Sequence, residues 1–183
     1  MPPAVHVLSH PAAYKDGARV LVLRARNKDG AVTLRTISRA SFDAATFDQQ
    51  LEGLLEMIRP GERIYASAGA RDVAKAVRLF KERQLAADYD PDVQAFYRDL
   101  EGRWLSCLMD TRSQAEKIWL LDCDSAEKTA RARTELSALG LGAYEYATKS
   151  GTHLVLPAFD KSRLTSETRD LLHDNALMLW AYS

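Results

Sequence analysis

Three polar segments in the last third of the chain contain residue types that bind metals or phosphates. They are Asp122-Cys123-Asp124, which ends an apolar run, Ser150-Gly151-Thr152-His153, and Asp174. Side chains two residues apart on a strand share a face, so Asp122 and Asp124 are expected side by side. Adjacent carboxylates repel one another unless a cation compensates them, and Mg²⁺ is commonly held by one or two carboxylates plus substrate phosphates. The pair therefore predicts a site for Mg²⁺ or Mn²⁺.

The sequence around these segments predicts the elements that position them. Strands are expected at 117–124, 143–148, 152–159 and 176–182, with helices at 125–140 and 166–173. The order β-α-β-β-α-β is typical of ferredoxin-like and RNA-recognition folds. In that fold the first strand is central and the third and fourth strands flank it, so the three polar segments should meet at one edge of the sheet.

The first of these strands is apolar on both faces. Ile118 and Leu120 lie on one face, and Trp119 and Leu121 lie on the other. A strand of this kind is expected to be covered on both sides. One cover should be the unit's own helices and the other the N-terminal half of the chain, with the acidic residues in a cleft between them.

The N-terminal half is expected to form an α/β module. The runs 19–26 and 31–39 are rich in β-branched residues, and the turn signal Asn27-Lys28-Asp29-Gly30 between them predicts a hairpin. Further elements are predicted as a helix from a Ser41 cap to about 59, a strand at 62–66, and helices at 71–87 and 91–109. The predicted fold class is α+β: one domain, with an N-terminal lobe (1–112) packed on a ferredoxin-like or RNA-recognition-like lobe (113–183).

The charge of the chain argues against a protein that depends on nonspecific DNA binding. Its 183 residues include 25 basic and 25 acidic side chains, so the net charge is zero. Residues 1–40 nevertheless hold seven basic side chains against two acidic ones. Candidate contacts to nucleic acid are the hairpin residues Arg24, Arg26 and Arg35 and the helix residues Arg71, Lys75 and Arg78. The alternative for the second set is an ordinary solvated helix face.

Several features indicate a cytoplasmic protein without a membrane partner. No apolar run approaches the roughly 20 residues that span a bilayer. The N-terminal residues do not match the pattern of a secretion signal. Cys107 and Cys123 fit neither a metal spacing nor a disulfide framework.

The motifs resemble those of the archaeo-eukaryotic primase superfamily, which includes small primase-polymerases encoded by phages and plasmids. The matching features are the hydrophobic run ending in Asp122-Cys123-Asp124 and the Ser150-Gly151-Thr152-His153 segment at a strand start. The resemblance implies that Asp122 and Asp124 bind the catalytic metal. It also implies that His153, helped by Ser150 and Lys149, contacts the nucleotide's phosphates. Asp174 is the candidate for a third catalytic acid.

The expected function is therefore metal-dependent addition of nucleotides on a nucleic-acid template, with nucleotides and single-stranded DNA or RNA as partners. Two alternatives stay open. One is a catalytically reduced accessory protein that binds nucleotides or nucleic acid, and the other is a metal-dependent phosphoesterase. A purely structural role is also open for each motif, with Asp124 or Ser125 as a helix cap and His153 as an ordinary edge residue.

Overall fold

The computed structural model describes residues 4–26 and 33–183 and has an α+β fold with two antiparallel sheets. The five-stranded sheet has the order β1-β9-β4-β2-β3, with bounds His6–Val7, Leu177–Tyr182, Glu62–Ser67, Arg19–Arg26 and Thr33–Ser41. The four-stranded sheet has the order β6-β7-β5-β8, with bounds Tyr144–Ala147, Thr152–Pro157, Ile118–Cys123 and Leu172–Asp174. The predicted turn at 27–30 lies outside the described residues.

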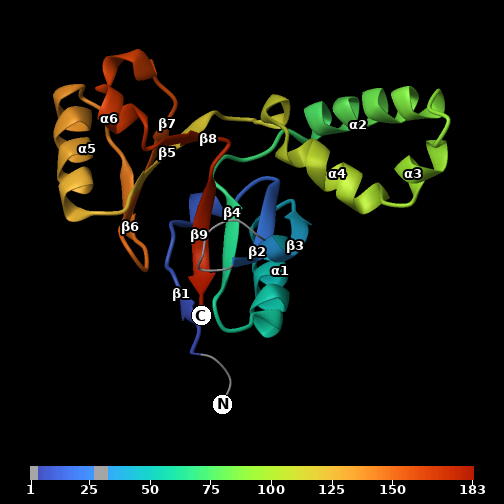
Figure 1. Ribbon diagram of the computed structural model, residues 1–183, viewed down its shortest axis with the longest axis horizontal. Coiled ribbons are helices and arrows are strands. Elements are labelled where there is room, and N and C mark those ends of the chain that lie inside the picture. The colour runs from blue at the N-terminus through green and yellow to red at the C-terminus, as the bar shows by residue number, and fades with distance from the viewer. Residues whose placement is uncertain (1–3, 27–32) are drawn as a thin grey trace.

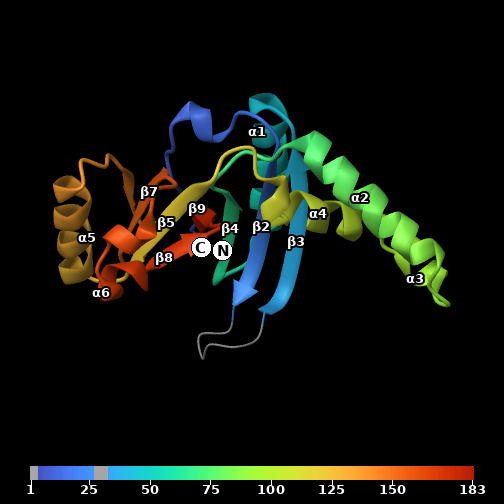
Figure 2. The same cartoon turned by 90° about the horizontal axis from the view of Figure 1, so that it is seen from above.

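The helices lie on the outer sides of the two sheets and in a projecting arm (Figures 1 and 2). The α-helices are α1 (Ala44–Met57), α2 (Val73–Asp88), α3 (Val93–Tyr97), α4 (Leu100–Met109), α5 (Ala126–Ala138) and α6 (Ser166–Arg169). Short 3₁₀ turns are η1 (Ala12–Tyr14), η2 (Thr111–Ser113) and η3 (Lys161–Arg163). Helices α2, α3 and α4 form the arm, which extends away from both sheets (Figure 1). No described helix combines the length and apolarity needed to cross a membrane.

Local signals explain where the N-terminal helices begin. The expected cap Ser41 instead ends β3, and Asp43 caps α1 by accepting a hydrogen bond from the Thr46 backbone N–H at 2.7 Å. The helix expected from residue 71 begins at Val73 because Asp72 is its cap. The single helix expected at 91–109 is divided because Asp99 leaves helical geometry and caps α4.

Strand β5 is central in its sheet, as predicted, between β7 and β8. Both of its faces are covered. Leu120 belongs to the cluster that includes α1 and the five-stranded sheet. Trp119 and Leu121 pack in a second cluster with Ala132 and Leu136 of α5. The expectation of two covers is confirmed, and the four-stranded sheet is the layer between α5 and the five-stranded sheet.

The last strand of the chain lies in the five-stranded sheet. The prediction that it belongs to the C-terminal sheet was wrong. The segment 176–182 was expected to be the fourth strand of the C-terminal sheet, but residues 177–182 form β9 between β1 and β4. The fourth strand is β8, which lies where the end of the helix at 166–173 was expected. Residues 178–181 are all buried, so both faces of β9 are covered, as expected for a strand inside a sheet rather than at its edge. The predicted lobes at 1–112 and 113–183 therefore share a sheet.

The packing of β5 against α5 predicts a large cost for shortening Leu121, which is fully buried. We expect Leu121→Ala to lower the free energy of unfolding by about 2–5 kcal/mol, measured by urea denaturation. Leu85 on α2 is 61% exposed, so Leu85→Ala is the matched control and should change stability by less than about 0.5 kcal/mol. Equal losses in the two variants would contradict this packing.

Candidate functional site

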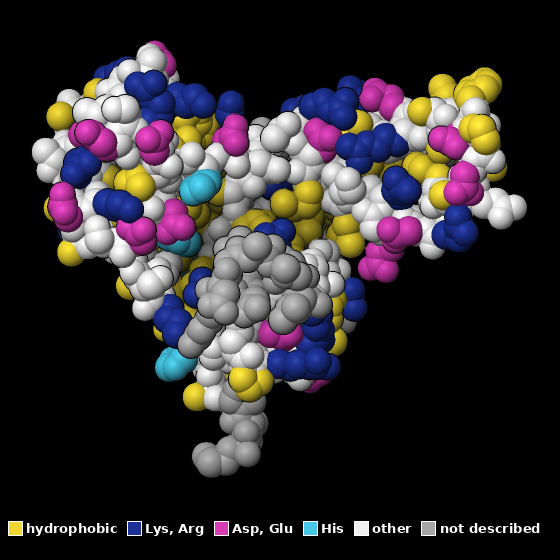
Figure 3. Space-filling model, in the orientation of Figure 1, with side chains coloured by type: hydrophobic (Ala, Val, Ile, Leu, Met, Phe, Trp, Pro, Cys, Tyr) yellow, Lys and Arg dark blue, Asp and Glu magenta, His cyan; other side chains and the backbone are white. Residues whose placement is uncertain are grey.

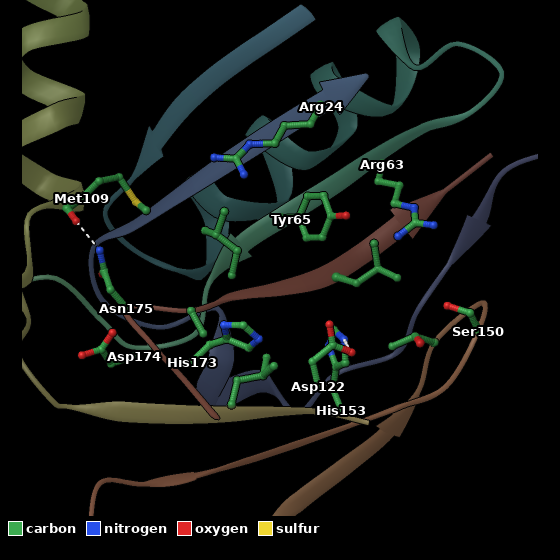
Figure 4. A pocket seen from close by; sticks show the side chains of 15 residues that line it. Arg24, Arg63, Tyr65, Met109, Asp122, Ser150, His153, His173, Asp174 and Asn175 are labelled. Atoms are coloured by element: carbon green, nitrogen blue, oxygen red, sulfur yellow. Dashed lines mark hydrogen bonds and ion pairs between the residues drawn. The ribbon is translucent and has the colours of Figure 1, made fainter. Parts of the chain in front are cut away.

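A polar cleft of about 430 Å³ lies between the two sheets (Figure 4). One wall comes from β2, β4 and β9, and the other comes from β5, β7 and β8. The lining residues are Arg24, Arg63, Tyr65, Met109, Leu120, Asp122, Thr148, Ser150, His153, His173, Asp174, Asn175, Ala176, Leu177 and Leu179. Its volume is within the range of ligand sites, about 300–1,000 Å³. The cleft therefore has the size and the polar side chains of a small-molecule site.

Asp122 and His153 form a pair on the wall made by the four-stranded sheet. They are directly opposite in the β5–β7 register, and His153 Nε2 lies 3.2 Å from Asp122 Oδ1. The hydrogen bond from His153 lowers the pKa of Asp122; burial opposes this effect, and the charges of His173 and Arg63 add to it. The sheet thus joins two predicted site residues that are far apart in sequence.

Gly151 allows this pair to form because the β6–β7 turn passes very close to the end of β5. A Cβ atom at Gly151 would lie 2.1 Å from the carbonyl oxygen of Cys123, which is far inside van der Waals contact. The turn is closed by a hydrogen bond from Thr148 N–H to the Gly151 carbonyl oxygen at 2.8 Å. The glycine in the Ser-Gly-Thr-His segment is therefore required for the backbone approach.

The opposite wall presents two arginines. Arg24 of β2 and Arg63 of β4 are direct cross-strand neighbours, and both line the cleft. Neither forms an ion pair with any residue in the described ranges, 4–26 and 33–183. Like charges directly opposite each other on a sheet are destabilising, so this arrangement has a cost in the free protein. Both side chains lie on the side of the cleft that faces Asp122 and His153 (Figure 4).

Asn175 closes one end of the cleft and connects it to the helical arm. Its φ of 52° is in the left-handed region, which asparagine tolerates better than most residues. Its Oδ1 accepts hydrogen bonds from Arg71 Nη1 at 2.6 Å and from Gln114 Nε2 at 3.2 Å. Its Nδ2 donates to the carbonyl oxygen of Met109 at 2.7 Å. The junction between β8 and β9 is therefore fixed by contacts to the arm.

The structure brings most of the predicted catalytic and phosphate-binding residues to this cleft. Asp122, His153, Ser150 and Asp174 all line it. Asp124 does not line it, since β5 ends at Cys123 and the Asp124 carboxylate forms an ion pair with Lys128 Nζ of α5 at 2.7 Å. Lys149 also lies outside the lining; it is exposed, with its ammonium 5.5 Å from the centre of the Tyr182 ring.

The predicted basic residues have several different environments, and among those whose side chains the structure describes only Arg24 lines the cleft. Arg35 pairs with the buried Glu62 at 3.1 Å. Arg71 was expected on an exposed helix face, but it precedes α2 and is only 4% exposed, and burial lowers its pKa to about 10. Lys75 Nζ donates to the Gln114 carbonyl oxygen at 3.2 Å.

Of the other two predicted basic residues, Arg78 is exposed on α2, and the side chain of Arg26 lies outside the described residues. Lys and Arg side chains are interspersed with acidic ones over both the sheets and the arm (Figure 3). The predicted stripe of Arg71, Lys75 and Arg78 is therefore not a continuous basic surface.

Five lining residues with polar side chains were missed by reasoning from the sequence: Arg63, Tyr65, Thr148, His173 and Asn175. Arg63 and Tyr65 alternate with buried residues along β4, so the period of two marks them as one face. His173 is opposite Leu120 in the β5–β8 register and shares its face. Arg63 and Tyr65 could have been found from the alternation along β4. His173 could be placed only with knowledge of the strand β8, which the sequence did not predict.

The residues present fit a divalent cation only in part. No three His, Cys, Asp or Glu side chains among the described residues are grouped so as to hold a metal ion. Asp124 is engaged with Lys128, which leaves Asp122 as the carboxylate beside His153. One carboxylate fits a Mg²⁺ or Mn²⁺ ion whose remaining ligands are water and substrate phosphates. It does not fit an ion held by protein ligands alone.

Comparison of the chain with protein-family models, with curated proteins and with solved structures finds no match.

The lowered pKa of Asp122 predicts how stability depends on pH. A carboxyl whose pKa is lowered by folding stabilises the protein above its unfolded pKa, near 3.8, and loses this contribution as the pH falls through the folded pKa. Between pH 5 and pH 3, wild-type protein should therefore lose more unfolding free energy than Asp122→Asn, as measured by urea denaturation. Glu56→Gln, at an exposed position on α1, should follow the wild type. An equal loss in Asp122→Asn and wild type would show that the Asp122–His153 bond does not stabilise the fold.

Proposed function

We propose that the cleft binds a nucleoside triphosphate together with a divalent cation, in a protein of the primase-polymerase kind. The observation that carries this proposal is the adjacent pair Arg24–Arg63, which has no ion-pair partner among the described residues and faces Asp122 and His153 across the cleft. Arginine side chains bind phosphate oxygens with paired, charge-assisted hydrogen bonds. A bound polyphosphate would remove the repulsion between the two guanidinium groups.

Asp122 is the carboxylate beside His153 in the cleft, and the cation would bind there. Asp122 would hold one Mg²⁺ or Mn²⁺ ion, and the ion would offset phosphate charge that the arginines leave uncompensated. The Nε2 atom of His153 lies on the same side of the cleft, within hydrogen-bond distance of Asp122. His153 would thus contact phosphate oxygens beside the ion, and Ser150 at the cleft's edge supplies a further hydroxyl.

The strand order of the four-stranded sheet supports the proposed similarity to primase-polymerases. The first strand of a β-α-β-β-α-β unit lies between the third and the fourth, and β5 lies between β7 and β8 in the same way. The site residues come from the strands that the resemblance implies, with Asp122 at the end of β5 and His153 at the start of β7. The expected activity is attack of a 3′-hydroxyl on an α-phosphate, on a single-stranded DNA or RNA template.

The contact between Asp124 and Lys128 favours a second candidate function. If this ion pair persists when nucleotide binds, the cleft has one carboxylate from the Asp-x-Asp motif rather than two. The protein would then bind nucleotides without joining them, as a catalytically reduced accessory protein. Incorporation of dNTPs or NTPs on primed and unprimed templates, with Mg²⁺ or Mn²⁺, separates the two functions.

We expect Arg24→Ala and Arg63→Ala each to weaken triphosphate binding at least about tenfold, because each removes a guanidinium group that would contact phosphate. Calorimetry with a nucleoside triphosphate and Mg²⁺ measures this, and the unphosphorylated nucleoside should bind far more weakly. Arg78 on α2 is exposed and does not line the cleft, so Arg78→Ala is the matched control. Wild-type affinity in both cleft variants would rule out phosphate binding by this pair.

Replacing Asp122 and replacing Asp124 should have different effects on metal-dependent triphosphate binding. Asp122→Asn should abolish the gain in triphosphate affinity that Mg²⁺ or Mn²⁺ provides, because the only motif carboxylate that lines the cleft is lost. Asp124→Asn should retain this gain, because Asp124 is paired with Lys128 outside the cleft. Titrations of both variants with and without metal make the comparison. Equal loss in the two variants would show that both carboxylates hold the ion.

A further inference from the structure

A chain of hydrogen bonds runs from the five-stranded sheet through Tyr146 to the cleft. The backbone N–H of Leu179 in β9 donates to the Tyr146 hydroxyl at 3.1 Å. That hydroxyl lies 2.6 Å from His153 Nδ1, and the other ring nitrogen, Nε2, lies 3.2 Å from Asp122 Oδ1. Tyr146 and His153 are direct partners in the β6–β7 register. Tyr146 itself does not line the cleft, so it can act on the site only through His153.

The first link of this chain arises from an irregularity in the β4–β9 ladder. Ile64 pairs with Ala181, but the next residue, Tyr65, pairs with Leu179, so that Trp180 is skipped. At this shift the Leu179 N–H is directed to the tyrosine of the other sheet. A backbone N–H can only donate a hydrogen bond, so the Tyr146 oxygen is the acceptor in this contact.

The direction of the first link decides the direction of the second. The Tyr146 side chain is buried, and an unpaired hydroxyl hydrogen there would lose a hydrogen bond that it makes in water. Burial also raises the pKa of Tyr146 well above its ordinary value, so the hydroxyl keeps its proton. Among the described residues, His153 Nδ1 is the acceptor within reach of that proton. Nδ1 of the neutral ring is therefore unprotonated, and Nε2 carries the hydrogen.

We infer that Tyr146 is a positioning residue that holds His153 in the Nε2–H tautomer. In this form His153 presents an N–H donor on the side of Asp122 and the cleft, and Nε2 has no lone pair available for a metal ion. The ligand atoms recognised at this point are thus hydrogen-bond acceptors, such as the oxygens of phosphate. This last step rests on the proposed function, but the tautomer itself does not.

The test is a long-range ¹H–¹⁵N correlation spectrum of the histidine rings at pH 8, above the ordinary histidine pKa of about 6.5. His153→Gln identifies the His153 signals by their disappearance. Wild-type protein should show His153 with the proton on Nε2. Because the Asp122 carboxylate also accepts from Nε2, the effect of Tyr146 is measured in Asp122→Ala: this variant should keep the proton on Nε2, and Asp122→Ala combined with Tyr146→Phe should show a mixture of tautomers. Tyr144→Phe is the matched control, because Tyr144 stacks on Tyr146 but its hydroxyl contacts His10 and Ser9.

Triphosphate binding with Mg²⁺ gives the second readout. Tyr146→Phe should weaken it by about three- to tenfold, the effect of losing one oriented hydrogen bond, and Tyr144→Phe should leave it unchanged. A wild-type His153 that carries its proton on Nδ1 would overturn the inference, whether or not Tyr146→Phe folds. An unchanged tautomer when Tyr146→Phe is added to Asp122→Ala would also overturn it. The Nε2–H tautomer in a wild-type protein that binds no triphosphate would support the role of Tyr146 and overturn the proposed function.

Discussion

Strand β5 is buried on both faces along its apolar stretch, and the positions of the other elements follow from this constraint. Trp119 and Leu121 require the cover that α5 provides, and Leu120 requires the cover of the five-stranded sheet. Asp122 lies on the same face of β5 as Leu120, just past the end of the apolar stretch. At this point the two sheets enclose the cleft. The packing that stabilises β5 thus also creates the cleft and places a carboxylate in it.

Much of the cleft's second wall could be predicted from the sequence because its strands follow the order of a known β-α-β-β-α-β unit. Alternation places Asp122 on one face of β5, and the pairing of the first and third strands of this unit brings it to His153. The Tyr146–His153 register follows from the tight turn before β7, so the tyrosine could also have been found. Asp124 could not be placed by alternation, because the strand ends before it and Lys128 on the next helix is a closer partner for its charge.

The parts that could not be predicted depend on pairing between distant segments. Strand β9 has a pattern that suits either sheet, and its place is decided by strands far away in the sequence, β1 and β4. The partners of each arginine likewise depend on segments that are distant in the sequence. Arg35 neutralises the buried Glu62, while Arg19 donates to backbone carbonyl oxygens, including those of Ser67 and Ala68. Arg24 and Arg63 line the cleft and have no ion-pair partner among the described residues, although composition alone does not separate them from the others.

The short connection between β8 and β9 limits how the cleft can change its width. Only residues 175 and 176 separate these strands, so the Cα atoms of Asp174 and Leu177 can never be more than about 11 Å apart. The two walls are therefore tethered at that end, and contacts to the arm fix Asn175 there. Ser150 and Arg63 lie at the opposite end (Figure 4). A relative movement of the two sheets is therefore limited by the chain itself at the Asn175 end, and only by side-chain contacts at the other.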